Sequence, residues 1–324
     1  MDNQLPEESL SSEAIIYQIT ASLNSPLEEN DPCFAACSNG LLRSMNGGRT
    51  WEDAFGSLSL ESPLATTAIA LSPDFQKDQN LIVGVAGGLL KSMDRGRSWL
   101  GTEFPTPPPT ITSLAISPNF AEDGVVLAGT MEDGVLRSAN QGDRWAAWNF
   151  GLLDLSVMCL AISPDFARDE ILFAGTESGL FHSTNGGRAW REVNLPIGYE
   201  PVISLAISPN FAKDKVLFAG TETKGLLLTT DCGETWQVLW ENKINQAVNA
   251  IVTAPKYPEH PEVLVIHGQD LLLSRDGGNT WSEWRPAAIS DKPVSAILAP
   301  QGFGLNAPIL LGLVGGEILR IVEG

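Results

Sequence analysis

The chain has 324 residues, and its 39 acidic and 20 basic side chains give a formal net charge of −19 at pH 7. Nucleic acids and anionic membranes bind proteins through a basic footprint, so this composition excludes both classes of partner. No run of apolar residues approaches transmembrane length, and we expect no membrane insertion.

The first residues (1–13) are acidic and lack the basic and apolar regions of a signal peptide. Beyond them the chain is organised as a repeat. Each repeat opens with apolar residues that alternate with small or polar ones, such as ITSLAIS over residues 111–117, a period typical of a half-buried strand. Seven such strands are predicted, beginning near Ile15, Thr66, Ile111, Val157, Val202, Val248 and Val294.

A turn motif follows this strand in four repeats: Ser-Pro, Asp or Asn, Phe, and an acid three residues later, ending at Asp78, Asp123, Asp169 and Asp214. Proline ends the strand and the polar residue favours a turn. We expect the phenylalanine to pack under the sheet. Two apolar runs and a short fourth segment complete four strands in about 46 residues, which is the size of one β-propeller blade.

An eight-residue phrase occurs six times between the third and fourth strands, at residues 44–51, 92–99, 138–145, 183–190, 229–236 and 274–281. Its pattern is Ser/Thr–x–Asp/Asn–x–Gly–x–x–Trp. The Asp or Asn folds back onto backbone N–H groups, the glycine allows a positive φ, and the tryptophan covers the hairpin. We expect structural roles for Asn46, Asp94, Asn140, Asn185, Asp231 and Asp276, and for Trp51, Trp99, Trp145, Trp190, Trp236 and Trp281.

These turns resemble the Asp-box (BNR) repeat of sialidases, xyloglucanases, sortilins and the photosystem II assembly propellers. The resemblance implies an all-β fold, a seven-bladed β-propeller of four-stranded antiparallel blades with Asp-box turns. It implies less about activity, because the box is a folding element in families of unrelated function.

One propeller domain over residues 1–324 is predicted, with blades at about 14–55, 65–104, 111–150, 157–195, 202–241, 248–286 and 294–324. The fourth strand is present only six times. Either residues 1–5 supply the missing outer strand and close the ring, or the last blade has three strands.

Four cysteines do not predict disulfides. Cys33 and Cys37 lie four positions apart on one strand, roughly 13 Å at strand rise, which is too far to bridge. Cys159 is predicted on an inner strand and Cys232 in a box turn. Reduced thiols and the lack of an export signal predict a cytoplasmic protein.

The motifs of common catalytic sites are not found: the chain has no P-loop, dinucleotide fingerprint or Ser or Cys triad, and its three histidines lack metal-ligand spacing. No metal or cofactor is therefore expected. Among families with the box, sialidases need an arginine triad, but the arginines here belong mostly to the repeat. Xyloglucanases use two propellers. Whether the chain is an enzyme stays open, with no catalysis favoured.

Sites in propellers usually lie where the connections from fourth to first strands meet the turns between second and third strands. Acids at corresponding turns predict a rim for a basic peptide or a divalent cation, unless they only form good hairpins: Glu132, Glu177, Glu222 and Asp270. Two pairs break the repeat and are the preferred partner contacts: Tyr199 with Glu200, and Trp240 with Glu241.

The sequence thus favours a non-catalytic protein-interaction scaffold that uses this loop face to bind a protein, with a basic protein as one option. A glycan-binding protein or a glycoside hydrolase of the BNR type is the alternative, and would need a carboxylate pair. A photosystem II assembly-factor-like propeller is a minor alternative, because that family is expected to carry a basic patch and this chain is acidic.

Overall fold

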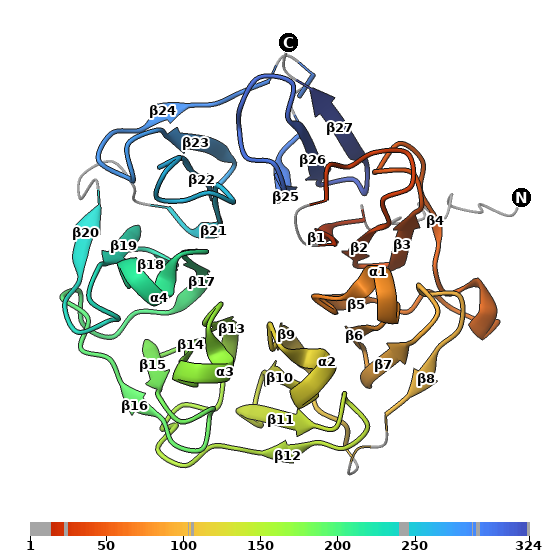
Figure 1. Cartoon of the computed structure of the whole chain (residues 1–324), viewed down its shortest axis with the longest axis horizontal. Coiled ribbons are helices and arrows are strands. Elements are labelled where there is room, and N and C mark those ends of the chain that lie inside the picture. Colours follow the sequence, from red (N-terminus) through yellow and green to blue (C-terminus); the bar gives the residue numbers. More distant parts are fainter. Residues whose placement is uncertain are drawn as a thin grey trace, which may run out of the picture.

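The computed structural model describes residues 14–22, 25–102, 104, 107–239, 246–286, 288–289 and 292–322. Seven antiparallel sheets are arranged radially as the blades of a propeller (Figure 1), so the predicted fold class is confirmed. In the described residues, six blades have four strands in sequence order and the last blade has three. The closing strand considered for residues 1–5 falls outside the described residues.

The strands of the first four blades are as follows. Blade 1 has β1 (Ile16–Ala21), β2 (Cys33–Cys37), β3 (Gly40–Ser44) and β4 (Glu52–Asp53); blade 2 has β5 (Thr66–Leu71), β6 (Leu81–Val85), β7 (Gly88–Ser92) and β8 (Leu100–Gly101). Blade 3 has β9 (Ile111–Ile116), β10 (Val125–Thr130), β11 (Val135–Ala139) and β12 (Ala146–Ala147); blade 4 has β13 (Val157–Ile162), β14 (Leu172–Thr176), β15 (Leu180–Ser183) and β16 (Arg191–Glu192).

The remaining blades repeat this order. Blade 5 has β17 (Val202–Ile207), β18 (Leu217–Thr221), β19 (Leu226–Thr229) and β20 (Gln237–Leu239); blade 6 has β21 (Val248–Thr253), β22 (Val263–His267), β23 (Asp270–Ser274) and β24 (Ser282–Glu283). Blade 7 has β25 (Val294–Leu298), β26 (Pro308–Leu313) and β27 (Ile318–Val322). A short 3-10 helix, η1 (Gly56–Leu58), follows blade 1.

The core lies between neighbouring blades. Every residue of each second strand is buried, because adjacent sheets cover both of its faces. Phe173 and Phe218, for example, are fully buried. Burying a side chain of this size stabilises the fold by roughly 1.5–3 kcal/mol.

The turn motif after the first strand forms one-turn helices at α1 (Phe75–Asp78), α2 (Phe120–Asp123), α3 (Phe166–Asp169) and α4 (Phe211–Asp214). Its phenylalanines are buried, as predicted. The acid has a role that the sequence did not reveal: Ser72 Oγ donates to Asp78 Oδ2 at 2.6 Å, and Asn80 N donates to Asp78 Oδ1 at 3.0 Å. The same pair of bonds recurs in blades 3, 4 and 5. The aspartate therefore joins the end of the first strand to the start of the second.

The first strands of successive blades, which form the inner ring of the propeller, are also linked to one another by hydrogen bonds. A side chain near the start of one inner strand donates to the first carbonyl of the next: Thr67 Oγ1 to Ile111 O at 2.7 Å, Thr112 to Val157 O at 2.6 Å, Cys159 Sγ to Val202 O at 3.4 Å and Ser204 to Val248 O at 2.6 Å. All four bonds point in the same direction around the ring.

Blade 7 meets blade 1 through contacts of a different kind. Arg320 on β27 donates from Nε to Gly47 O at 3.2 Å and from Nη2 to Leu27 O at 3.3 Å. Ile15 forms an isolated antiparallel bridge with Val314. The four cysteines are free, as expected, with Cys33 and Cys37 at the two ends of β2.

Candidate functional site

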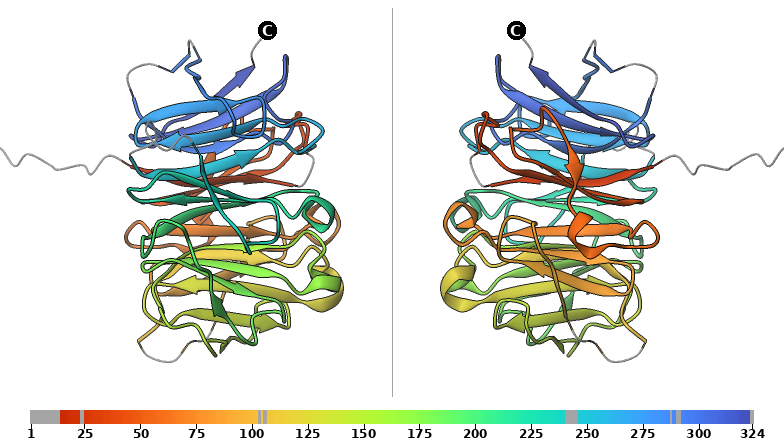
Figure 2. Two further views of the ribbon diagram at one scale, coloured as in Figure 1. Left: turned by 90° about the vertical axis from the view of Figure 1, so that its left-hand side faces the viewer. Right: turned by 90° about the vertical axis from the view of Figure 1, so that its right-hand side faces the viewer.

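The two faces of the propeller differ in structure. Helices α1–α4 gather on one face, as the side views show (Figure 2), and the turns between third and fourth strands end on the same side. We call this the box face. The turns between second and third strands, and the connections from each fourth strand to the next first strand, form the opposite face, which we call the loop face.

The six turns of the box face have the hydrogen bonds of Asp-box turns. In blade 2, Ser92 Oγ donates to Asp94 Oδ1 at 2.8 Å, and Gly96 N donates to Ser92 Oγ at 2.8 Å. The other five boxes repeat these two bonds. The box tryptophans are buried at Trp99 and Trp190 and half-buried in the other four turns. The recurring Ser/Thr, Asp/Asn and Trp side chains of these turns therefore have structural roles.

Three of the boxes carry a titrating aspartate. Burial of Asp94 acts to raise its pKa, but hydrogen bonds from Ser98, Ser92 and the backbone outweigh that effect and lower the pKa to about 2. For Asp231 the main cause is the hydrogen bond from the Thr235 side chain, and the pKa is again about 2. The pKa of Asp276 is lowered in the same way. The carboxylates of these turns are therefore ionised at neutral pH.

On the loop face, the four predicted rim acids are exposed and lie in or beside the corresponding turns of four blades. Only Glu177 and Glu222 occupy the same position, since in blade 3 the equivalent backbone bond is donated by Met131 N. Glu132, Glu177 and Glu222 lie in the turns of blades 3, 4 and 5, and Asp270 begins β23 in blade 6. The turns themselves are stabilised by threonine: in blade 3, Thr130 Oγ1 donates to Gly134 O at 2.8 Å. Within the described part of the chain, the carboxylates of Glu132, Glu177 and Glu222 take part in no hydrogen bond or ion pair. Their carboxylates are therefore open to solvent.

The pair that breaks the repeat between blades 4 and 5 separates into two roles. The Tyr199 side chain is 81% exposed, whereas Glu200 is only 7% exposed. Glu200 Oε1 accepts hydrogen bonds from Thr223 N at 2.6 Å and from Thr223 Oγ1 at 2.7 Å. Glu200 thus fastens the connection to the neighbouring turn and is not presented to a partner. The second predicted pair, Trp240 and Glu241, lies outside the described residues.

Sequence reasoning missed two further anchors of this kind. Asp154 Oδ2 accepts from Ser178 N at 2.7 Å, and Asn149 Oδ1 accepts from Val135 N at 2.8 Å. Burial of Asp154 opposes ionisation, but hydrogen bonds from Ser156, Ser178 and Thr176 lower its pKa. Asn149 holds the turn of the preceding blade and Asp154 the turn of the following blade, and only their place in this connection distinguishes them in the sequence.

Charge is distributed unevenly between the faces. The described loop-face turns and connections, with the adjoining strand ends, carry the carboxylates of Asp53, Glu61, Glu132, Asp133, Asp154, Glu177, Glu192, Glu200, Glu222, Asp270, Glu283 and Glu317. The same elements carry the cations Lys224, Arg285 and Lys292, and Lys292 pairs with Glu317 at 3.3 Å. Most arginines of the chain belong to the box-face side, such as Arg188, which pairs with Glu170 at 3.0 Å. On the loop face, acids therefore clearly outnumber cations.

Among the residues that the structure describes, no group of three or more His, Cys, Asp or Glu side chains is placed to hold a metal ion. The divalent-cation alternative for the acidic turns is therefore not supported. No helix in the described ranges is long and apolar enough to cross a membrane.

Fold and turns define this protein as a seven-bladed β-propeller with Asp-box-type turns. No model of a known protein family matches the chain, and no curated protein matches it. Solved structures do. YCF48 bound to a D1 peptide aligns with a TM-score of 0.71 and 20% identity over 97% of this chain and 95% of the other. YCF48 from Cyanidioschyzon merolae aligns with a TM-score of 0.66 and 15% identity over 97% of each chain.

A GH74 xyloglucanase from Xanthomonas campestris is also similar, with a TM-score of 0.73 and 16% identity over 96% of this chain. This chain spans only 52% of the xyloglucanase chain. At these identities the likeness establishes the fold and no activity.

Proposed function

We propose that this protein is a non-catalytic interaction scaffold that binds a basic segment of a partner protein on its loop face. The observation that carries the proposal is the row of exposed acids at equivalent turns, Glu132, Glu177, Glu222 and Asp270, on a face with few cations. Complementary charge steers a partner to such a face and fixes its orientation.

Two further observations support this proposal. Tyr199 stands exposed on the same face, and tyrosine is a common anchor in protein interfaces because its rigid ring loses little conformational entropy. YCF48, a propeller of the same fold, has been solved with a bound peptide. A glycan-binding role is the competing proposal.

The test is selection of short random peptides on the immobilised protein, followed by affinity measurements with the enriched peptides. We expect these peptides to be rich in lysine and arginine and to bind more weakly at high salt. The variant E132K/E177K/E222K is expected to weaken binding by about tenfold or more, because three attractive contacts become repulsive.

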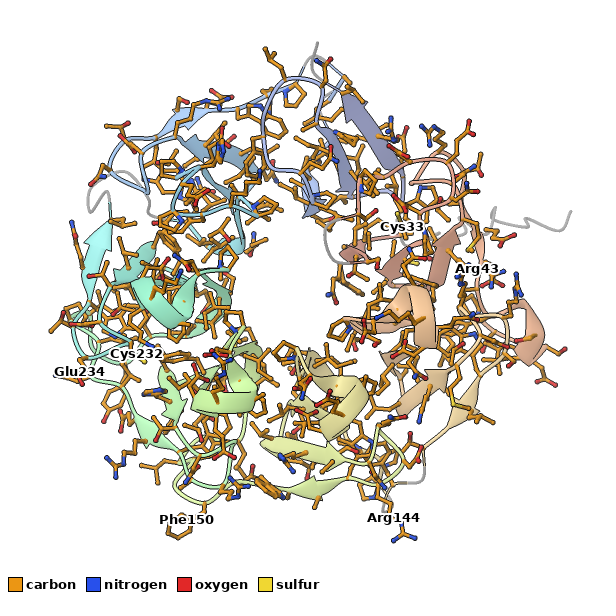
Figure 3. The ribbon with its side chains drawn as sticks, viewed as in Figure 1. Cys33, Arg43, Arg144, Phe150, Cys232 and Glu234 are labelled. Atoms are coloured by element: carbon orange, nitrogen blue, oxygen red, sulfur yellow. The ribbon has the colours of Figure 1, made fainter. Side chains whose placement is uncertain are left out.

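The matched control reverses three exposed acids of the box face, Glu122, Glu234 and Glu259, to lysine. Glu234 lies at the outer edge of the propeller in Figure 3. This control changes the net charge by the same amount and should leave binding unchanged. If both variants lost the same affinity for the peptides, the effect would come from net charge alone, and the assignment of binding to the loop face would be overturned. Enrichment of no peptide, together with binding on a glycan array, would favour the glycan proposal.

A further inference from the structure

Exposed large apolar side chains gather on one connection, residues 148–156 between β12 and β13. Phe150 is 81% exposed and Leu153 is 80% exposed, while Leu155 is exposed to a smaller extent. Phe150 projects outward from the outer edge of the propeller, between blades 3 and 4 (Figure 3). Isolated exposed apolar residues are ordinary, but several on one short connection mark an interaction surface.

The connection is held rigidly on both sides. Towards blade 3, Gly134 N donates to Leu155 O at 3.0 Å, and Asn149 Nδ2 donates to Asp133 O at 2.8 Å. Towards blade 4, Asp154 accepts from Ser178 N at 2.7 Å. The apolar side chains are therefore displayed on an ordered backbone, and little conformational entropy would be lost when a partner packs against them.

Further bonds fix the outer end of this connection. Trp190 N donates to Phe150 O at 2.8 Å, and Leu152 N donates to Asn149 O at 2.9 Å. Gly151 has φ +80, and a Cβ there would lie 2.3 Å from the carbonyl oxygen of Trp190. Leu152 is buried, unlike its neighbours on either side. Leu152 thus packs in the core, while Phe150 and Leu153 are exposed to solvent.

A groove of about 370 Å³ adjoins this connection. It crosses the outer strands of blade 3 and is lined mainly by apolar groups, among them Phe104, Pro107, Leu136, Trp145 and Leu155. The rings of Phe104 and Trp145 lie 6.4 Å apart between centroids. Such a hollow is suited to an apolar anchor side chain.

The borders of the groove and the connection are acidic. Asp133 lines the groove, Glu132 precedes it in the same exposed turn, and Glu177 lies in the corresponding turn of blade 4. Residues 131–134, 148–156 and 176–179 include no lysine, arginine or histidine. Two guanidinium groups, of Arg137 and Arg188, lie against the Trp148 ring at the outer end, at 4.3 and 5.6 Å. The charge beside the exposed leucines is thus negative.

We propose that the groove of blade 3 and the connection 148–156 form one docking site for a partner segment in which apolar side chains are flanked by lysine or arginine. This inference rests on the proposed loop-face function and names where and by what chemistry the partner is bound. The apolar groups enter the groove and cover Leu153 and Phe150, and the basic groups face Glu132, Asp133 and Glu177.

The test uses peptides selected on the wild-type protein and measures their affinity for a double variant, F150S/L153S. Binding is expected to weaken by about tenfold or more, because interface energy concentrates in a few large apolar anchors. Both side chains project into solvent, so the unfolding temperature should stay the same. The matched control is Leu305→Ser, since Leu305 is 79% exposed and lies between β25 and β26 on the box face.

Four outcomes separate the two proposals. Peptides with apolar and basic residues that lose affinity for F150S/L153S, and not for Leu305→Ser, support the docking site. Basic peptides that lose affinity for E132K/E177K/E222K but bind F150S/L153S normally overturn this site and leave the loop-face function standing. Enrichment of no peptide overturns both. A dimer of the protein that sedimentation detects, and that F150S/L153S dissociates, would identify a second copy as the occupant and overturn the basic partner.

Discussion

Exchanging aspartate and asparagine between two Asp-box turns should transfer acid sensitivity from one blade to another. In blade 2, Asp94 Oδ1 accepts from Arg97 N and Ser98 N at 2.9 Å, and Asp94 Oδ2 accepts from Ser98 Oγ at 2.6 Å. In blade 4, Asn185 Oδ1 accepts from Ala189 N at 2.9 Å, and position 189 has no hydroxyl. The perturbations are Asp94→Asn and Asn185→Asp.

The hydrogen bonds lower the pKa of Asp94 from 3.8 to about 2, so the folded protein binds this proton less readily than the unfolded chain. The resulting stabilisation is present above about pH 4 and is lost as the pH falls towards 2. At 1.36 kcal/mol per pKa unit the difference corresponds to ~2 kcal/mol, which solvent screening at this partly exposed site reduces to about 1 kcal/mol.

The assay is urea unfolding followed by tryptophan fluorescence at neutral pH and at about pH 4 and pH 2.5. Asp94→Asn should lose about 1 kcal/mol less than the wild type between the two acidic conditions, and at neutral pH it should cost little, because Asn46 fills the same position in blade 1. Asn185→Asp should add acid sensitivity. An acid-induced loss in Asp94→Asn equal to that of the wild type would refute the reasoning.

Three further predictions concern the contacts that hold the loops and the ring. Gly151→Ala should destabilise the protein by about 2 kcal/mol or more in thermal unfolding, because the new Cβ would meet a backbone carbonyl. The control Gly198→Ala, at φ +76 with nothing within 4 Å of the new Cβ, should cost about 1 kcal/mol. Glu200→Ala should cost about 2 kcal/mol and increase hydrogen exchange at the Thr223 amide; unchanged exchange there would contradict the anchoring role. Arg320→Met should cost about 1–2 kcal/mol and raise exchange in blades 1 and 7 above that in blade 4, while a uniform rise would argue against a local seam.

The repeat made the fold predictable from the sequence. Strand alternation gave the start of β5 at Thr66 and of β13 at Val157, because the same alternation of apolar and small or polar residues marks each inner strand. Burial along these strands is less regular than the sequence pattern. The box turns were equally predictable, since these hydrogen bonds join residues at most four positions apart in the sequence.

The candidate site was less predictable because its roles depend on contacts distant in sequence. Glu200 is separated by 23 positions from Thr223, which makes it an internal anchor, and nothing in its local sequence distinguishes it from an exposed acid. Leu152 and Leu153 are adjacent and chemically identical, yet one is buried and the other is 80% exposed. Only the path of the backbone through Gly151 decides between them.

The bonds of the inner ring have a consequence for how such a chain can change in evolution. Thr67, Thr112, Cys159 and Ser204 each supply a donor to the following blade, whose first carbonyl accepts it. Every junction of this type therefore has one half in each of two successive units. Gain or loss of one whole unit by unequal recombination would therefore preserve complete junctions on both sides. The direction of these bonds thus favours change in steps of one blade.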